Sequence, residues 1–415
     1  MKANRRRRIG VDLLVLSQFS FTGIVTYART ILPYLIEQLP ECDWVLFVGA
    51  RQDLGFDHHR YPNVRVKVSP WMKSHWLWKL VGLSLEAMLE RLDLLFIPLS
   101  RAPLLKTCPL IVYIHDLGFR NMPEYLKRGT VTKTALAMRH SVYVADAILT
   151  NSEFTKSEIR SSYGTPERAI NVTCLGFDQQ TFNLQPIDPR EAKTVLGRYG
   201  IRQPYVLYLG VIQGRKNLSR LIEASEHWRR SEPELQLVLA GKRGWNCEEI
   251  YRSAEGFPST QVNVTGPVRQ EDLRTIYQMA ECYVLPSAYE GFGIPVIEAM
   301  ACGTPVLLSR AAALPEVGGN AALYFDLEDP RDIAEKILQL TASTELRRCM
   351  IEAGVARAAN FTWKACAHQT VPVFKAILEG RPIGPETACI VSQSHRVEST
   401  DKTKDSVLTS NPDCR

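Results

Sequence analysis

Short β-branched runs alternate with longer segments of helical spacing along this 415-residue chain, and this alternation constrains its fold more than any other feature. Apolar strands separated by helices predict parallel sheets with right-handed crossovers. Asn183, Pro186 and Pro189 interrupt the alternation, which then restarts. We therefore expect an α/β protein with two doubly wound, Rossmann-like domains. The expected strands are Ile9–Ser17, Trp44–Gly49, Val64–Ser69, Leu92–Pro98, Leu110–Asp116, Ala147–Ser152, Val172–Gly176, Tyr205–Gly210, Leu235–Gly241, Val262–Gly266, Cys282–Ser287, Pro305–Ser309 and Ala321–Asp326.

The same pattern gives the expected domain boundaries. Residues 1–185 form the first domain, residues 186–360 the second, and residues 361–380 a closing helical segment. From residue 381 to residue 415, Ser, Thr, Asp, Lys and Pro replace the apolar periodicity, which predicts a disordered tail.

Composition excludes some classes of partner and compartment. The net charge of +6 lacks the dense basic stripes of a nucleic-acid-binding protein. The basic run Arg5–Arg8 favours either weak contact with an anionic membrane or a solvated tail. The ten cysteines form no CxxC pair and lie at no zinc-ligand spacing. A strand-like run follows the arginines, so we expect no signal peptide. We expect reduced thiols and a cytoplasmic protein.

The string LPSAYEGFGIPVIEAMACGTP is the most informative part of the sequence. A predicted strand ends in a loop with Gly291 and Gly293, and a helix begins near Pro295. Glycines allow close backbone approach, and a helix N-terminus attracts phosphate. Glu290 precedes the glycines, and we expect Glu298 in the first helical turn, where the helix dipole would stabilise its anion. Two such carboxylates could hold ribose hydroxyls, although either one alone is explained as a solvated glutamate.

The string resembles the signature of glycosyltransferase family 4, of the retaining GT-B class. The signature has two glutamates separated by seven residues around a GFG-type loop, and the resemblance continues through ALPEVGGNAALYFDLEDP, which contains Glu316. It implies two Rossmann-like domains facing a central cleft, with the closing helix returning to the first domain. It also implies that Glu298 binds the donor ribose, that Glu290 lies by the donor sugar, and that Glu316 belongs to a donor or acceptor loop. The diphosphate would be held by loop amides at Gly291, Phe292, Gly293 and Ile294.

Two basic turns in the second half support this interpretation. In GVIQGRKN, Arg215 and Lys216 lie between a strand and a helix, where they could neutralise a departing nucleoside diphosphate. A turn that merely caps the helix is the structural alternative, and the resemblance favours the functional role. In LVLAGKRGW, Lys242 could lie near the nucleotide.

In the first half, YIHDLGF places His115 and Asp116 at a strand end, where family members line the sugar site. FTGIVTYAR supplies Gly23 near the donor phosphate, but Val25 replaces the second glycine of the family pattern. The segment Trp71–Arg91 is rich in Trp, Leu and Lys. It is either an amphipathic helix that touches a membrane or a lipid-linked acceptor, or part of the core.

The expected function is retaining transfer of a hexose from a nucleoside diphosphate sugar to a saccharide or polyprenyl-linked saccharide during polysaccharide biosynthesis. The expected catalytic residues are Glu290, His115, Lys216 and Arg215. The resemblance extends to bacterial mannosyltransferases, which favours GDP-mannose and leaves UDP-sugars and dTDP-rhamnose open. No DxD motif is present, so we expect no metal and no other cofactor. The expected location is the cytoplasm, with peripheral contact at the inner face of the membrane. The alternatives are a non-catalytic scaffold or partner subunit, and a nucleotide-sugar epimerase.

Overall fold

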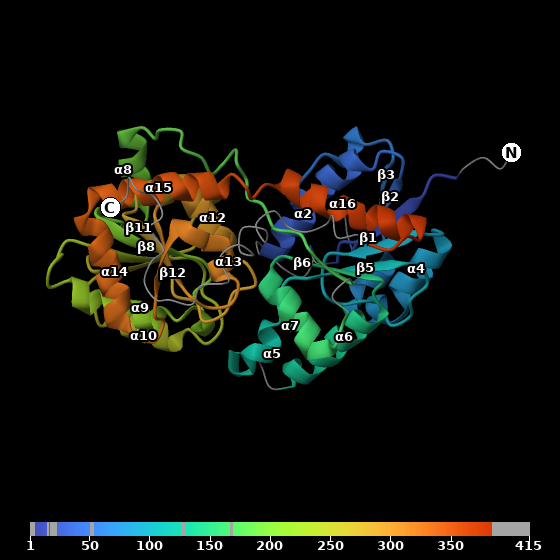
Figure 1. The fold of residues 1–415 in the computed structure, drawn as a ribbon, viewed down its shortest axis with the longest axis horizontal. Coiled ribbons are helices and arrows are strands. Elements are labelled where there is room, and N and C mark those ends of the chain that lie inside the picture. The colour runs from blue at the N-terminus through green and yellow to red at the C-terminus, as the bar shows by residue number, and fades with distance from the viewer. Residues whose placement is uncertain are drawn as a thin grey trace. The chain divides into compact units, whose positions relative to one another are not determined.

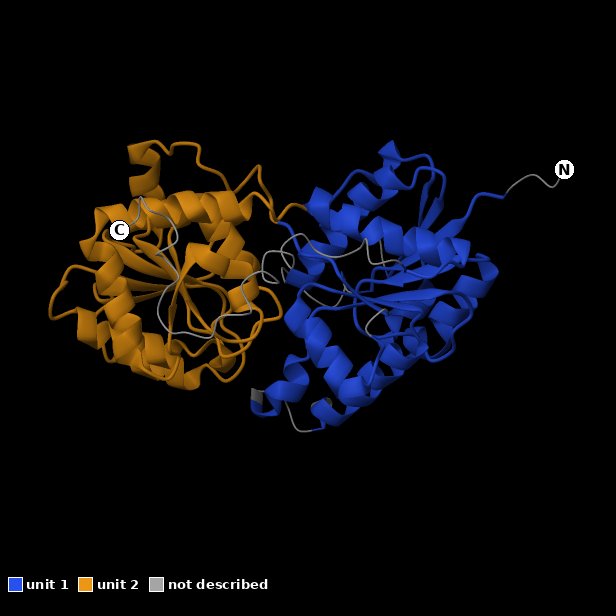
Figure 2. Cartoon of the chain, in the orientation of Figure 1, with its two compact units in different colours: residues 1–176, 363–394 blue, residues 177–362, 395–415 orange. Residues whose placement is uncertain are grey.

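The computed structural model describes residues 5–14, 16, 23–49, 54–125, 129–166 and 169–383. These residues form two compact units (Figure 2). Unit 1 combines the chain up to residue 176 with the segment that begins at Trp363, and unit 2 contains residues 177–362. Residues 384–415, most of the tail expected to be disordered, lie outside the described residues.

Unit 1 is built on a seven-stranded sheet in the order β3-β2-β1-β4-β5-β6-β7 (Figure 1). Each neighbouring pair of strands is parallel. Ile9 lies opposite Trp44 on one side and Leu94 on the other, so β1 is an interior strand. The strands are β1 (Arg8–Asp12), β2 (Asp43–Val48), β3 (Val64–Val68), β4 (Leu94–Ile97), β5 (Leu110–Ile114), β6 (Ala147–Thr150) and β7 (Ile170–Val172).

Helices cover both faces of this sheet. Val45 and Phe47 point into a core that includes Trp78. Successive strand residues face opposite ways, and Trp44 contacts Phe374 of the last helix, with ring centroids 6.4 Å apart. The last helix, α16, also lies beside α2 and thus completes unit 1 (Figure 1). The helices are α2 (Gly23–Gln38), α3 (His75–Leu77), the π-helical turn η3 (Trp78–Gly82), α4 (Leu83–Leu89), α5 (Gly118–Asn121), α6 (Thr130–Val144), α7 (Glu153–Tyr163) and α16 (Trp363–Glu379).

Unit 2 repeats this design with a six-stranded parallel sheet in the order β10-β9-β8-β11-β12-β13. Its strands are β8 (Tyr205–Leu209), β9 (Gln236–Ala240), β10 (Val262–Gly266), β11 (Cys282–Leu285), β12 (Val306–Ser309) and β13 (Ala322–Phe325). Its helices are α8 (Pro189–Arg198), α9 (Leu218–Trp228), α10 (Glu248–Glu255), α11 (Leu273–Gln278), α12 (Ile294–Ala301), α13 (Leu314–Gly318), α14 (Pro330–Ala342) and α15 (Thr344–Ala358).

The predicted α/β class is confirmed, and each expected strand has a counterpart in one of the two sheets. The first strand is shorter than expected, since β1 ends at Asp12 rather than at Ser17. The carboxylate of Asp12 accepts the N–H of Leu14 at 3.1 Å. This local bond takes the place of a ladder bond and ends the strand.

The expectation that all cysteines are reduced is wrong for Cys174 and Cys349, which are disulfide-bonded. Neither residue lies in a recognisable disulfide pattern, and a chain of this size needs no cross-link to form a core, so the sequence gives no signal for these disulfides. Six other described cysteines are free. Within the described ranges, no helix combines the length and apolarity that crossing a bilayer requires.

Candidate active site

The predicted donor residues of unit 2 converge where the strand order of its sheet reverses. Strands β8 and β11 are neighbours there, and open α/β sheets bind ligands beyond the carboxyl ends of such strands. Arg215 and Lys216 lie in the short helical turn η6 (Gly214–Lys216), which follows β8, and Glu290 lies in the loop after β11. The N–H of Ala288 donates to the main-chain oxygen of Arg215 at 3.1 Å, which ties the two loops together.

Glu290 forms the centre of a buried charge cluster. Lys216 Nζ donates to its Oε1, and Arg215 Nη1 lies 3.4 Å from its Oε2. Ser287 Oγ donates to Oε1 at 2.7 Å. Burial by itself would raise the pKa of Glu290, but Lys216 and Arg215 outweigh burial and lower the pKa to about 2. The carboxylate is therefore charged at neutral pH, and the three ionised groups together carry one net positive charge.

Arg215 is fixed by further bonds. Its Nη1 donates to the main-chain oxygen of Tyr289 at 2.6 Å. With the amide oxygen of Gln213 turned toward the guanidinium, Arg215 Nε donates to that oxygen at 2.8 Å. Because its side chain is already held in position, Arg215 can stabilise a negative charge on a ligand without much loss of side-chain freedom.

The glycine loop leads into α12 in the way that a phosphate site requires. Gly293 has φ +111°, and a Cβ at this position would lie 3.2 Å from Leu314 Cδ2, so the turn needs glycine. The helix begins at Ile294, and its first N–H groups have no intrahelical acceptor. The side chain of Phe292 is buried against Phe361, with ring centroids 5.7 Å apart, so Phe292 can offer a ligand its backbone only. Gly291 is buried in the same loop.

Glu298 differs from the expectation in both position and charge. Since α12 begins at Ile294, Glu298 is in its second turn, and the effect of the helix N-terminus falls off within the first turn. Burial raises the pKa of Glu298 to about 7, and the nearby charge of Asp178 adds to the rise. The Tyr277 hydroxyl donates to Glu298 Oε2 at 3.3 Å and opposes this rise only in part. The expected stabilisation of the Glu298 anion by the helix is therefore wrong.

Lys242 lies on the loop after β9, which is joined to the loop after β8. Ile212 N–H donates to the main-chain oxygen of Lys242 at 2.9 Å, and the Lys242 residue is exposed. At the start of this loop, a Cβ on Gly241 would lie 1.8 Å from the main-chain oxygen of Gly210, so no other residue fits. Glu316 lies in α13, and its main-chain oxygen accepts a bond from Arg357 Nη2 at 2.5 Å.

The remaining predicted residues belong to unit 1. His115 follows β5, and its Nε2 lies 2.9 Å from the carbonyl oxygen of Pro98. A carbonyl only accepts, so Nε2 carries the hydrogen and Nδ1 is the acceptor. Burial lowers the pKa of His115 to about 4, which keeps the ring neutral. Asp116 is exposed and accepts the N–H of Gly118 at 2.9 Å.

Gly23 is the first residue of α2, and the loop that precedes it lies outside the described residues. Val25, which replaces a glycine of the family pattern, is buried on this helix. Its side chain therefore serves packing, and the substitution is compatible with the fold.

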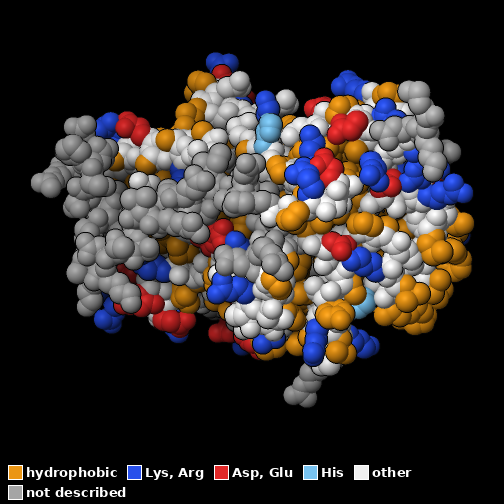
Figure 3. Space-filling view, turned by 45° about the vertical axis from the view of Figure 1, so that its right-hand side comes forward, with side chains coloured by type: hydrophobic (Ala, Val, Ile, Leu, Met, Phe, Trp, Pro, Cys, Tyr) orange, Lys and Arg blue, Asp and Glu red, His pale blue; other side chains and the backbone are white. Residues whose placement is uncertain are grey.

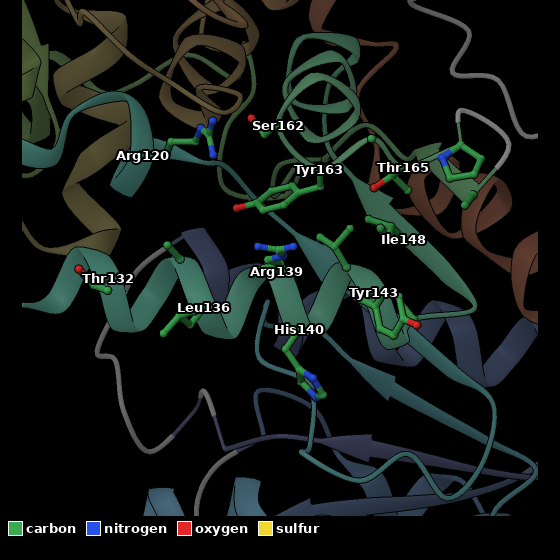
Figure 4. A pocket seen from close by; sticks show the side chains of 16 residues that line it. Arg120, Thr132, Leu136, Arg139, His140, Tyr143, Ile148, Ser162, Tyr163 and Thr165 are labelled. Atoms are coloured by element: carbon green, nitrogen blue, oxygen red, sulfur yellow. The ribbon is translucent and has the colours of Figure 1, made fainter.

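A separate hollow of about 1040 Å³ lies in unit 1 between α6 and α7 (Figure 4). Arg120, Arg139 and Tyr163 are among its lining residues, and none of the predicted site residues is. It therefore adds nothing to the predicted donor site. Over the described residues, no three His, Cys, Asp or Glu side chains are grouped as a metal site would need.

Two polar residues that the sequence analysis left without a role contact the predicted glutamates. Ser287 lies three positions before Glu290 in the most informative string, and this closeness in sequence could have suggested the contact between them. Tyr277 lies on α11, 21 positions before Glu298, and no local pattern connects the two.

Comparison with known proteins identifies the family of the chain. Residues 21–181 match the family model for Glycosyltransferase Family 4, and residues 198–357 match the model for glycosyl transferases group 1. The O-antigen chain mannosyltransferase B of Escherichia coli is 34% identical over 270 residues, which cover 64% of this chain and 70% of that protein. The serotype-specific mannosyltransferase WbdA of Escherichia coli is 30% identical over 243 residues, which cover 57% of this chain and 29% of WbdA.

Solved structures show the same fold at low sequence identity. A sucrose-phosphate synthase from Thermosynechococcus elongatus has a TM-score of 0.73 at 19% identity, with 90% of this chain and 100% of that chain covered. The Anabaena protein HepE in complex with UDP has a TM-score of 0.67 at 16% identity, with coverage of 89% and 100%. The chain belongs to the family 4, group 1 glycosyltransferases and has their two-domain, Rossmann-like GT-B fold.

Proposed function

We propose that this glycosyltransferase moves mannose from GDP-mannose, with retention of configuration, to a saccharide or polyprenyl-linked saccharide in polysaccharide synthesis. The observation that carries the proposal is the cluster of Arg215, Lys216 and Glu290 at the strand reversal of unit 2, beside the start of α12. The similarity to two mannosyltransferases favours mannose. The proposed location is the cytoplasm, at the inner face of the membrane.

In the proposed donor complex, the diphosphate lies against the amides of the glycine loop and of the first residue of α12, from Gly291 to Ile294. Arg215 and Lys216 neutralise the negative charge that develops as GDP departs. Because two cations and a helix N-terminus are available for this charge, we propose that transfer needs no metal ion. The carboxylate of Glu298 accepts hydrogen bonds from the ribose hydroxyls.

Glu290 has a different proposed role, because its charge is fixed and balanced by the two cations. It supports an oxocarbenium-like anomeric centre by electrostatics and holds Lys216 in place. His115 supplies a neutral hydrogen-bond acceptor to the donor sugar through Nδ1. The departing diphosphate takes the proton of the acceptor hydroxyl, so attack and departure occur on the same face of the sugar.

The proposal is tested by binding and slow hydrolysis of a panel of nucleotide sugars, each in the presence of EDTA. We expect GDP-mannose to bind, and hydrolysis to fall about 100-fold in Lys216→Ala. We expect Glu298→Ala to weaken donor binding. NMR of the released or transferred sugar identifies the anomer and thus tests retention.

Three outcomes would contradict the proposal. Binding of a different donor would replace GDP-mannose and leave the transferase function. A folded protein that binds no nucleotide sugar would be a scaffold, and interconversion of two nucleotide sugars without release of nucleotide would indicate an epimerase.

A further inference from the structure

The surface of α3, η3 and α4 has an inverted polarity. A surface helix normally buries apolar residues and exposes charged ones. Here every exposed side chain from residue 76 to residue 89 is apolar. These side chains are Trp76, Leu77, Val81, Leu85, Met88 and Leu89, with Trp76 68% and Leu89 67% exposed.

The charged residues of the same segment point inward and are paired. Lys79 bonds to Asp12 at the end of β1. Glu86 accepts from Ser69 Oγ at 3.1 Å. Because these residues are held in unit 1, they cannot turn outward to cover the exposed side chains.

The loop after β4 extends this surface. Leu104 N–H donates to the main-chain oxygen of Lys79 at 2.9 Å, and Ser84 Oγ donates to the main-chain oxygen of Leu105 at 2.6 Å. Leu104 and Leu105 are 52% and 60% exposed. We call these two residues and the six helical ones the apolar face. Figure 3 shows hydrophobic side chains gathered on one side of unit 1.

The exposed charges in the stretch of chain that carries the apolar face have one sign. All exposed charged residues between positions 70 and 107 are basic: Lys73, Arg91, Arg101 and Lys106. Lys106 is paired with Asp146, so the other three supply most of the positive charge. The acidic residues Glu86 and Glu90 are buried.

Acidic residues neutralise the N-terminal arginines only in part, because Arg5 and Arg7 share one carboxylate. Arg5 lies 2.8 Å and Arg7 3.4 Å from Asp93, and Arg6 lies 2.8 Å from Asp43. Arg5, Arg6 and Arg7 are exposed, and these ion pairs hold them against the edge of unit 1.

A hollow of about 540 Å³ opens beside the apolar face. Trp76 and Leu104 of that face line it, together with Arg101, His75 and His140. No acidic side chain is among its lining residues. A lining that combines apolar side chains with a guanidinium and two imidazoles suits an anionic headgroup attached to hydrocarbon.

We propose that the apolar face docks unit 1 on the surface of an anionic bilayer. Its apolar side chains enter the boundary between headgroups and acyl chains, and Lys73, Arg91 and Arg101 lie over the lipid phosphates. A second copy of the chain fits less well, because a symmetric contact would bring the basic borders of both copies together. This proposal deepens the membrane contact proposed above and does not depend on the identity of the donor.

The test is co-sedimentation of the full chain with two kinds of vesicle, phosphatidylcholine alone and phosphatidylcholine mixed with phosphatidylglycerol. We expect binding to the mixed vesicles, with a blue shift of Trp fluorescence that Trp76→Phe reduces. The double variant Met88→Glu/Leu89→Glu should weaken binding at least about tenfold. Leu184→Glu is the matched control, since Leu184 is 54% exposed in unit 2, and it should bind like the natural chain.

Further variants separate the possible outcomes of this experiment. Lys73→Gln/Arg101→Gln should weaken binding to mixed vesicles only. Donor hydrolysis without acceptor should be unchanged in Met88→Glu/Leu89→Glu, so failure of this proposal is distinguishable from failure of the proposed function. If that variant does not fold, Trp76→Gln replaces it. Absence of vesicle binding by the natural chain overturns the proposal, and a dimer that Met88→Glu/Leu89→Glu dissociates assigns the face to a second copy.

Discussion

The raised pKa of Glu298 predicts that donor affinity depends on pH. In the free protein this pKa is about 7, so about nine in ten molecules carry a protonated Glu298 at pH 6, and about one in ten at pH 8. Two ribose hydroxyls that donate to Glu298 favour the carboxylate, so they lower its pKa in the complex and keep it ionised over this range. Binding therefore releases a proton, and affinity falls as the pH falls.

The magnitude follows from these populations. The dissociation constant should be about tenfold higher at pH 6 than at pH 8, which corresponds to about 1.4 kcal/mol. Most of the change should occur below pH 7. The other two predicted site residues with large pKa shifts should not contribute, because Glu290, with a pKa of about 2, stays charged and His115, with a pKa of about 4, stays neutral over this range.

Isothermal titration calorimetry with GDP-mannose measures both the affinity and the proton release. The sugar nucleotide is preferable to GDP, because its esterified diphosphate does not titrate between pH 6 and pH 8. Repeating the titration at pH 7 in buffers of different ionisation enthalpy should show release of about half a proton. Glu298→Gln should bind more weakly and with no pH dependence.

Two results would refute the reasoning. A dissociation constant that does not change between pH 6 and pH 8 would mean that Glu298 is not ionised by the ribose. A pH dependence that persists in Glu298→Gln would assign the titration to another group.

Three further variants test the packing of unit 2. Ser287→Ala removes a hydrogen bond to the Glu290 carboxylate, so urea denaturation at pH 7 should show a loss of about 1.5–3 kcal/mol, and an unchanged midpoint would contradict the bond. Lys216→Met leaves buried Glu290 without its closest counter-ion, so the melting temperature at pH 7 should fall. It should recover in part in the double variant Lys216→Met/Glu290→Gln. An equal fall in the single and double variants would argue against the ion pair. Gly241→Ala forces a Cβ to 1.8 Å from a backbone oxygen and should abolish soluble, folded protein. Its control Gly197→Ala, with no atom within 4 Å of the added Cβ, should be neutral or stabilising by up to about 1 kcal/mol, as circular dichroism melts can show.

The sequence predicted the sheets well because their signals are local. Continuous apolar runs mark parallel strands whose two faces are buried, and the prolines near Pro189 mark the start of α8. Asp188 caps this helix by accepting the N–H of Arg190 at 2.7 Å. At each of these places, residues close together in the sequence were enough to predict the element.

The site was predicted only in part, because charge and contact depend on residues far apart in the chain. The string around Glu290 located the loop, but the pairing of Glu290 with Lys216 joins positions 74 residues apart. The pKa of Glu298 could not be inferred from its helix, because burial and Asp178 dominate the effect of the helix. The exposed apolar side of α4 could not be predicted either. Helical spacing is normally read with the apolar side toward the core, and that rule fails here because the charged residues are the buried ones.

The return of α16 to unit 1 has a consequence for how the chain is made. The ribosome releases residues in order, and domains generally fold as units while synthesis proceeds. The described part of unit 2, residues 177–362, is continuous in sequence, so it can close its core as soon as residue 362 has emerged. Unit 1 begins first but must wait for Phe374 before Trp44 is covered. The half of the protein that is translated first is thus the half that finishes folding last.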